Sequence, residues 1–520
     1  MTKKSNNIIQ FNKKLLAFNS LSAVIARGIN LIILIWLQQY LLRRISAAEY
    51  SIYPVVLSVM MLVTIVRTIL TSGVARYITE AYSLNDIDGV KEMTSTMVIL
   101  QVSVATVLFV AGLFFSLHVN IILNIKSQFV LDAKIMFGIM VFSFCLQLAL
   151  MPFTVGLFVK QKFILINVFN VLTTIFRALL LFFLLTRISN RVLWVVVSME
   201  TANIIRLSLT VFFSKKALPE LRFSFNSFSW ERGKKLLSYG GWAFVGRIAN
   251  RIRTSADPII LNKFATPFDV TSFHLGFLFQ KQIEDALLLI TEPIMPGLTS
   301  LYVSKDFEKI RRTFTRFGRY ATWAVLFFSI PVMVFNQEFM RLYVGEKYLL
   351  AGTVSLLILG SEILTLGIRM THKIAVASGQ IKPVALRSIF MQIINLLLTL
   401  YLVGYKQLGA FGSALSTALV FIFIKPFLEI PLGLKLAHLG YKQWIHETII
   451  PGNMPAVISF MFLLFLKVLK TPDSWFLLGI ETLIGLGVYV FVLLKFCLMS
   501  NDKEDLKKLF ERKYRKLRKM

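Results

Sequence analysis

Long apolar runs, separated by short polar segments, follow one another along almost the whole chain. A helix of about 20 apolar residues is long enough to cross the hydrocarbon core of a bilayer. The pattern therefore predicts about fourteen membrane-spanning helices. The more polar segment 270–298 is included because its neighbours then alternate sides consistently. The predicted spans lie near residues 15–42, 51–75, 95–117, 133–158, 163–185, 191–213, 238–261, 270–298, 317–336, 350–378, 383–404, 410–433, 449–469 and 473–499.

The composition indicates an all-α polytopic membrane protein. Of the 520 residues, 56% are hydrophobic and only 16% are charged, whereas a soluble domain has about 25% charged residues. Apart from roughly 214–237 and the tail 500–520, no polar stretch is long enough for a catalytic domain, so an enzyme is not expected. Cys145 and Cys497 lie inside apolar runs, and His118, His438 and His446 fall in predicted loops with no ligand spacing around them, so neither a metal site nor a cofactor is predicted.

Basic residues gather in segments that the span order places on one side of the membrane. The net charge is +30, and these segments are the N-terminus, 214–237, 304–319 and the tail 500–520. Because positively charged loops stay in the cytoplasm, both termini are predicted to be cytoplasmic. The tail has the spacing of a basic amphipathic helix on an anionic membrane surface, and no fold for nucleic acid binding accompanies it.

An internal repeat appears when the chain is shifted against itself by 220 residues. This offset places Arg27 on Arg247 and Asn30 on Asn250 without a gap. It predicts two parallel six-helix lobes, 1–220 and 221–440, followed by two further helices in 441–500 and the basic tail 501–520. In transporters built from such repeats, the substrate site lies between the two halves.

Several arginines are predicted inside the membrane, where a charged residue usually faces a cavity or a partner. Arg27 lies about 18 Å into the first span, at 1.5 Å per residue. Arg247 and Arg251 share one face of the seventh span, with Asn250 beside them and no acidic residue on that face. These arginines are therefore expected to bind an anionic ligand.

Other charged residues within the spans allow two interpretations each. Asp257 either pairs with Arg253 or takes up a proton or Na⁺ when that pair opens. Two polar stripes, one on the eighth span and one on the tenth, either line a water-filled cavity or pair between helices. The first stripe holds His274, Lys281, Asp285 and Glu292, and the second holds Glu362, Arg369 and Lys373. Arg67 on the second span either lines the same cavity or reaches the headgroups.

The segment LLRRISAAEYSIY (41–53), followed by SGVARYITEAYSLND (72–86), resembles the start of the bacterial polysaccharide flippases, the O-antigen or Wzx-type family. Glu49, Tyr50 and Tyr53 match the family pattern, whereas Ser46 and Ser51 stand where the family usually has glycine. This family belongs to the multidrug/oligosaccharidyl-lipid/polysaccharide exporter (MOP) superfamily, together with the MATE drug antiporters and the lipid II flippases.

The resemblance implies a V-shaped, MATE-like bundle of two lobes that alternates between inward-open and outward-open forms. The implied cargo is an undecaprenyl-diphosphate-linked oligosaccharide, moved to the outer leaflet of the bacterial inner membrane for surface polysaccharides such as the O-antigen of lipopolysaccharide. The implied partners are membrane lipids, H⁺ or Na⁺ as coupling ion, and a polysaccharide polymerase complex. The last two helices are expected to hold the prenyl tail, as they do in lipid II flippases.

Candidate residues follow from this cargo. Guanidinium groups bind phosphate bidentately and keep their charge, so the diphosphate is assigned to Arg27, Arg247, Arg251 and Arg67. Contacts with the sugar and cavity lining are assigned to Asn30, Gln38, Asn250, Lys281, Gln280 and Arg369. The candidates for ion coupling are Asp257, Asp285 and Glu292. The alternative is a MATE-type drug antiporter on the same fold, for which an acidic cavity would suit the mostly cationic cargo.

Overall fold

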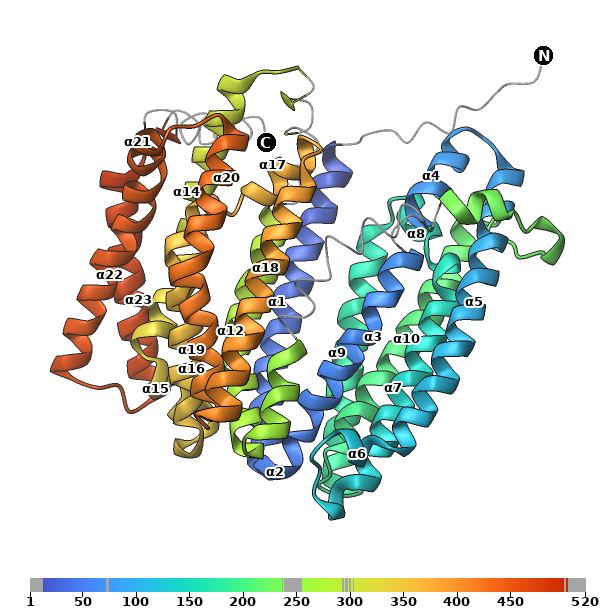
Figure 1. Ribbon diagram of the computed structural model, residues 1–520, viewed down its shortest axis with the longest axis horizontal. Helices are drawn as coiled ribbons and strands as arrows, with labels where there is room; N and C mark the ends of the chain where they lie inside the picture. The colour runs from blue at the N-terminus through green and yellow to red at the C-terminus, as the bar shows by residue number, and fades with distance from the viewer. Residues whose placement is uncertain are drawn as a thin grey trace, which may run out of the picture. The chain divides into compact units, whose positions relative to one another are not determined.

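The computed structural model describes residues 13–71, 74–235, 237, 255–291, 294, 298, 301–302, 304–499 and 502–503. Within these ranges the chain forms helices and their connections, without strands (Figure 1). Twelve of the described helices are long and apolar enough to cross a membrane. The prediction of an all-helical polytopic membrane protein is thus confirmed.

Two of the fourteen predicted spans are not among those twelve. The span 238–261 lies mostly outside the described residues, of which 255–264 are helical. The span 270–298 overlaps helix α12 (Pro267–Thr291), whose charged residues include Lys281 and Asp285.

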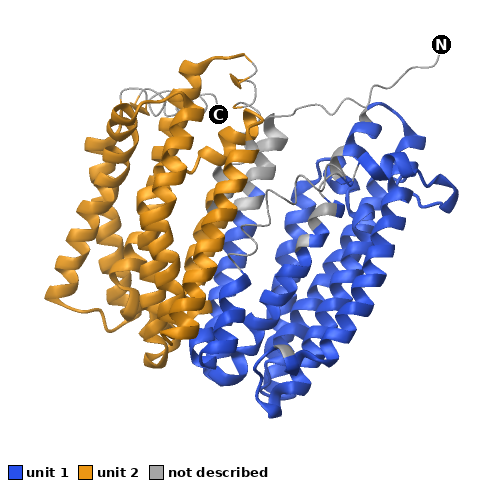
Figure 2. Ribbon diagram, viewed as in Figure 1, with its two compact units in different colours: residues 1–271 blue, residues 272–520 orange. Residues whose placement is uncertain are grey.

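The chain divides into two compact units, residues 1–271 and 272–520 (Figure 2). The boundaries expected from the repeat, at 220 and 440, stay a prediction. In unit 1, α7 packs against α5 and α10, and α9 packs against α1 and α10 (Figure 1). Its helices are α1 (Lys13–Arg44), α2 (Ala47–Tyr50), α3 (Ile52–Thr71), α4 (Val74–Ser83), α5 (Ile87–Leu117), α6 (Val119–Ile122), α7 (Val130–Leu150), α8 (Gly156–Val159), α9 (Phe163–Arg187) and α10 (Leu193–Ala217).

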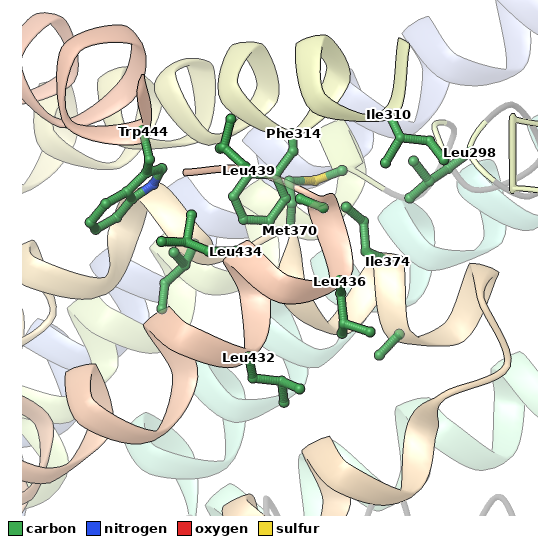
Figure 3. Packing of buried hydrophobic residues seen from close by; sticks show 13 residues of the cluster. Leu298, Ile310, Phe314, Met370, Ile374, Leu432, Leu434, Leu436, Leu439 and Trp444 are labelled. Atoms are coloured by element: carbon green, nitrogen blue, oxygen red, sulfur yellow. The ribbon is translucent and has the colours of Figure 1, made fainter. Parts of the chain in front are cut away.

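Unit 2 packs its last two long helices onto the α14 side of the unit, with α22 against both α14 and α23. Buried apolar side chains from α14, α17, α20 and α21, among them Phe314, Met370 and Trp444, form one core cluster (Figure 3). Its helices are α14 (Phe307–Val334), α15 (Asn336–Val344), α16 (Leu349–Ser361), α17 (Thr371–Ala377), α18 (Ile381–Thr399), α19 (Gly409–Leu419), α20 (Lys425–Ala437), α21 (Tyr441–Trp444), α22 (Ile450–Leu469) and α23 (Trp475–Val492).

Short tight or widened helical turns join several of these helices. Four turns of unit 2 are π-helical, with one residue more per hydrogen-bonded turn than an α-helix, while the described residues of unit 1 contain none. The π turns are η7 (Leu400–Tyr405), η8 (Val420–Ile424), η9 (Ile445–Ile449) and η10 (Leu493–Cys497). The tight 3-10 turns are η1 (Ser127–Phe129), η2 (Met151–Thr154), η3 (Phe225–Ser227), η5 (Glu346–Tyr348) and η6 (Ile363–Ile368).

The same helix start occurs in both units at the offset of the sequence repeat. Asp86 accepts a hydrogen bond from the Gly89 amide at 2.7 Å and begins α5. Asp306 accepts one from the Lys309 amide at 3.1 Å and begins α14. The residue before each cap, Asn85 in one unit and Lys305 in the other, is left-handed, with φ of 57° and 54°. This local agreement supports a duplicated unit.

A carboxylate after the last span is buried against α14. Asp502 and Arg319 are only 1% and 2% exposed, and their side chains form an ion pair. Asp502 also accepts hydrogen bonds from the Tyr320 hydroxyl at 2.7 Å and the Met499 amide at 3.2 Å. Arg319 donates a second hydrogen bond to the Glu447 carbonyl at 2.5 Å, so this contact joins three segments of unit 2.

Close helix approach in unit 2 depends on glycine. A Cβ atom at Gly276 of α12 would lie 2.6 Å from the Ala351 carbonyl oxygen of α16. Gly276→Ala is therefore expected to cost about 1–3 kcal/mol in the free energy of unfolding, because packed helices resist overpacking. Thermal unfolding of the purified protein measures this. Gly479→Ala on α23, where no atom of the described residues lies within 4 Å of the new methyl group, is the control and is expected to be neutral or stabilising.

Candidate functional site

A buried carboxylate lies in the interior of unit 1, on α10. The side chain of Glu200 accepts hydrogen bonds from the Ser143 hydroxyl of α7 at 2.5 Å and from the Asn203 amide at 3.1 Å, both at Oε2. Gln147 donates to Ser143 at 3.1 Å, and Glu200 is 6% exposed. In a membrane span, such a charged group marks a functional position by default.

Two arginines accompany this carboxylate. Arg206, on the same helix, donates to the side-chain oxygens of Asn170 on α9 and Asn203, each at 3.5 Å. Its charge is attracted by Glu200 and repels that of Arg67 on α3. Hydrogen bonds thus link α10 to α7 and to α9. Arg67, on α3, lies close enough to Arg206 for their charges to interact.

A cavity of about 160 Å³ lies between α3, α7 and α10. Its lining is mostly apolar, and the polar side chains in it are Thr64, Arg67, Gln147 and Glu200. Arg67 and Glu200 therefore face one small space inside unit 1.

Residues of the motif that carries the family resemblance form hydrogen bonds that connect α1, α2 and the start of α10. Glu49 is 8% exposed and accepts a hydrogen bond from the Val192 amide at 2.7 Å, directly before α10 begins. A carboxylate in this position satisfies an amide that the helix itself leaves unpaired. Ser46 begins α2 by accepting from the Glu49 amide at 3.2 Å. Gln38, expected to contact sugar, is 5% exposed and donates to the Tyr50 hydroxyl.

In unit 2, the polar stripe of the tenth predicted span contacts the eighth predicted span through a hydrogen bond between Gln280 and Glu362. Glu362 is 4% exposed, accepts a hydrogen bond from Gln280 at 2.5 Å and forms an ion pair with Arg369. Gln280 is itself 1% exposed. The prediction that Gln280 and Arg369 line a cavity stays a prediction. In the structure, both side chains contact Glu362.

The remaining candidates divide between described and undescribed residues. Arg27 and Asn30 lie on α1 and are both half-buried. The Oδ1 atom of Asn30 is buried and accepts no hydrogen bond from the residues that the structure describes. Asp257 is 7% exposed; on α12, Asp285 is half-buried and Lys281 is exposed. Four candidates and the predicted partner of Asp257 fall outside the described residues: Arg247, Asn250, Arg251, Glu292 and Arg253.

Glu200 and Arg206 were not predicted as site residues from the sequence. Both stand in the apolar sixth span, where any ionisable residue is a signal of function. They lie six positions apart, so no shared stripe drew attention to them. For metals, no three His, Cys, Asp or Glu side chains within the described ranges are placed to hold an ion.

Comparison with known proteins gives the family. The model of the family described as "Polysaccharide biosynthesis protein" matches residues 14–295, more than half of the chain. An uncharacterized membrane protein of Bacillus subtilis (strain 168), EpsK, is 19% identical over 491 residues, which cover 93% of this chain and 94% of EpsK.

Two solved structures are similar in fold. The lipid II flippase MurJ in an inward closed conformation has a TM-score of 0.67 at 14% identity, covering 91% of this chain and 97% of its own. A multidrug resistance MATE family transporter of the MOP superfamily, in an inward-facing conformation, has a TM-score of 0.63 at 14% identity, covering 80% and 98%. The chain therefore belongs to the polysaccharide biosynthesis protein family and has the fold of the MOP exporters.

Proposed function

We propose that this protein is a flippase that moves an undecaprenyl-diphosphate-linked oligosaccharide from the cytoplasmic to the outer leaflet of the bacterial inner membrane. The observation that carries the proposal is the charge inside unit 1, where Arg67 and Arg206 accompany a single carboxylate, Glu200. An excess of positive charge within a membrane span favours an anionic ligand. The family name supports a role in polysaccharide synthesis.

The diphosphate is assigned to Arg27 and Arg247, with Arg251 and Arg67 as further contacts. A diphosphate accepts bidentate hydrogen bonds from guanidinium groups, which stay protonated in a poorly hydrated site. Asn30 supports this assignment, because it lies one turn from Arg27 and its buried Oδ1 atom can accept a hydrogen bond from a sugar hydroxyl. Alternating access of two parallel lobes would carry the cargo across. The ion-coupling candidates Asp257, Asp285 and Glu292 belong to this proposal, as do the cytoplasmic termini and a polymerase partner.

A drug antiporter of the MATE type is the second candidate, because a MATE transporter shares the fold. Its mostly cationic cargo would suit an acidic cavity, whereas the charged group inside unit 1 has more arginine than carboxylate.

Ligand-dependent stability separates the two functions. Undecaprenyl diphosphate is expected to raise the unfolding temperature of the purified protein, because a ligand at 100 times its Kd adds about 2.7 kcal/mol of stability. Undecaprenol, which has the same tail without the phosphates, is the control and is expected to do much less. Stabilisation by tetraphenylphosphonium but not by the diphosphate would instead identify a cation transporter.

A further inference from the structure

The charges of the group inside unit 1 do not cancel. Arg67 and Arg206 carry two positive charges, and Glu200 carries one negative charge. Glu200 and Arg206 lie within the candidate span Leu193–Ala217, and Arg67 lies on α3, three residues after the candidate span Ala47–Thr64. Arg67 makes no hydrogen bond or ion pair with the residues that the structure describes, and its charge is repelled by Arg206. A charged side chain within a spanning helix is costly unless it faces a partner or a cavity. The group therefore retains one uncompensated positive charge.

Glu200 is held by one oxygen only. Ser143 and Asn203 both donate to Oε2, and none of the described residues donates to Oε1. Asn203 also accepts from Arg206, so this amide connects the carboxylate to the guanidinium. Because Glu200 reaches Arg206 through an amide and not through a direct ion pair, the arginine keeps donors for another anion.

The cavity lined by Arg67 and Glu200 can hold a small anionic group, and Arg206, which does not line it, is connected to Glu200 through Asn203. Its volume of about 160 Å³ corresponds to about five water molecules at 30 Å³ each. Four of its lining side chains are the methionines Met60, Met61, Met140 and Met199. Methionine is unbranched and flexible, so this wall can repack around a ligand.

We propose that Arg67 and Arg206 form an anion-binding site inside unit 1 for the phosphate of a lipid-linked cargo, and that the Glu200 carboxylate beside them weakens the binding of that phosphate. The inference rests on the proposed function, since the ligand is the same diphosphate-bearing lipid. While the cargo is bound, both arginines donate to its phosphate. The nearby carboxylate repels the phosphate and limits its affinity, which favours release. A carrier needs this balance, because a ligand that is held too tightly does not leave.

Binding of farnesyl diphosphate to the full-length purified protein tests the proposal, with farnesol as the uncharged probe. Glu200→Gln keeps the shape and removes the charge, and is expected to tighten farnesyl diphosphate binding about tenfold. Arg206→Met and Arg67→Met are each expected to weaken it by at least about tenfold. Ser143→Ala removes a hydrogen bond of Glu200 but keeps the charge, and is expected to change the affinity less than threefold. Farnesol binding is expected to be the same in all variants.

The outcomes distinguish this inference from the proposed function. An unchanged affinity in Glu200→Gln, with a normal unfolding temperature, would show that the carboxylate is only structural. If Glu200→Gln does not fold, unchanged binding in both Arg67→Met and Arg206→Met overturns the site. If Arg27→Ala weakens farnesyl diphosphate binding while these variants do not, the inference fails and the flippase proposal stands. No binding of the diphosphate by the unmodified protein overturns both.

Discussion

Asp502→Ala is expected to destabilise the protein by about 3–5 kcal/mol. This change removes the carboxylate from Arg319, which is 2% exposed. Breaking a buried ion pair from one side leaves an uncompensated charge, and that charge causes most of the loss. Arg319→Ala is expected to destabilise the protein less, because Asp502 keeps its ion pair with Arg316 at 3.5 Å and its hydrogen bonds from Tyr320 and Met499. The measurement is the unfolding of each variant in lipid nanodiscs.

A double variant and a surface control identify the cause. Arg319→Met with Asp502→Leu replaces both charges by apolar groups and is expected to recover most of the stability, since buried pairs tolerate such replacement. Asp473→Ala removes an exposed carboxylate from the connection between α22 and α23 and is expected to change stability by less than about 0.5 kcal/mol. A double variant as unstable as the single ones would argue against an unpaired charge as the source.

Arg27→Ala is expected to reduce polysaccharide export below detection while the protein still inserts into the membrane. Losing one partner of a buried, hydrogen-bonded charge pair costs about 2–5 kcal/mol, which slows transport by more than tenfold. Arg27→Lys keeps the charge without the planar fork and is expected to retain partial export. The same loss is expected for Arg247→Ala. Surface polysaccharide and membrane-inserted protein are both measured in cells that depend on the variant.

Arg43→Ala is the matched control, because Arg43 is an exposed arginine at the end of the same helix α1. It is expected to export normally. Normal export by Arg27→Ala would remove the diphosphate clamp from the proposal and leave the family and the fold untouched.

Most of the fold could be predicted from the sequence, because the length and spacing of apolar runs determine which segments can span a membrane. Parts of the polar chemistry were also predictable, such as Glu362 and Arg369 on one stripe. The partners of a buried polar group were not. Glu200 contacts Ser143, which lies 57 positions earlier in the chain, and Arg206 contacts Asn170, 36 positions earlier. Only the packing of α7, α9 and α10 brings these residues together, and no periodicity within one helix reports it.

Glu49 of the family motif is a further residue whose partner could not be predicted from the sequence. Glu49 stands out in the sequence, and a conspicuous acidic residue suggests a site of binding or coupling. In the structure its carboxylate holds the Val192 amide before α10. The residue therefore fixes the position of the helix that carries Glu200 and Arg206.

The π turns of unit 2 change the register of the helices in which they lie. A π turn accommodates one inserted residue, and an insertion rotates every later side chain of the helix by about 100°. The constant offset of 220 assigns Val420 as the counterpart of Glu200, and Val420 begins a π turn. If the two halves are repeats, as the offset predicts, positions beyond Leu400 that align by number are expected to point to different faces. The charged residues of this part of unit 2 therefore have to be matched to those of unit 1 by structure and not by a constant offset.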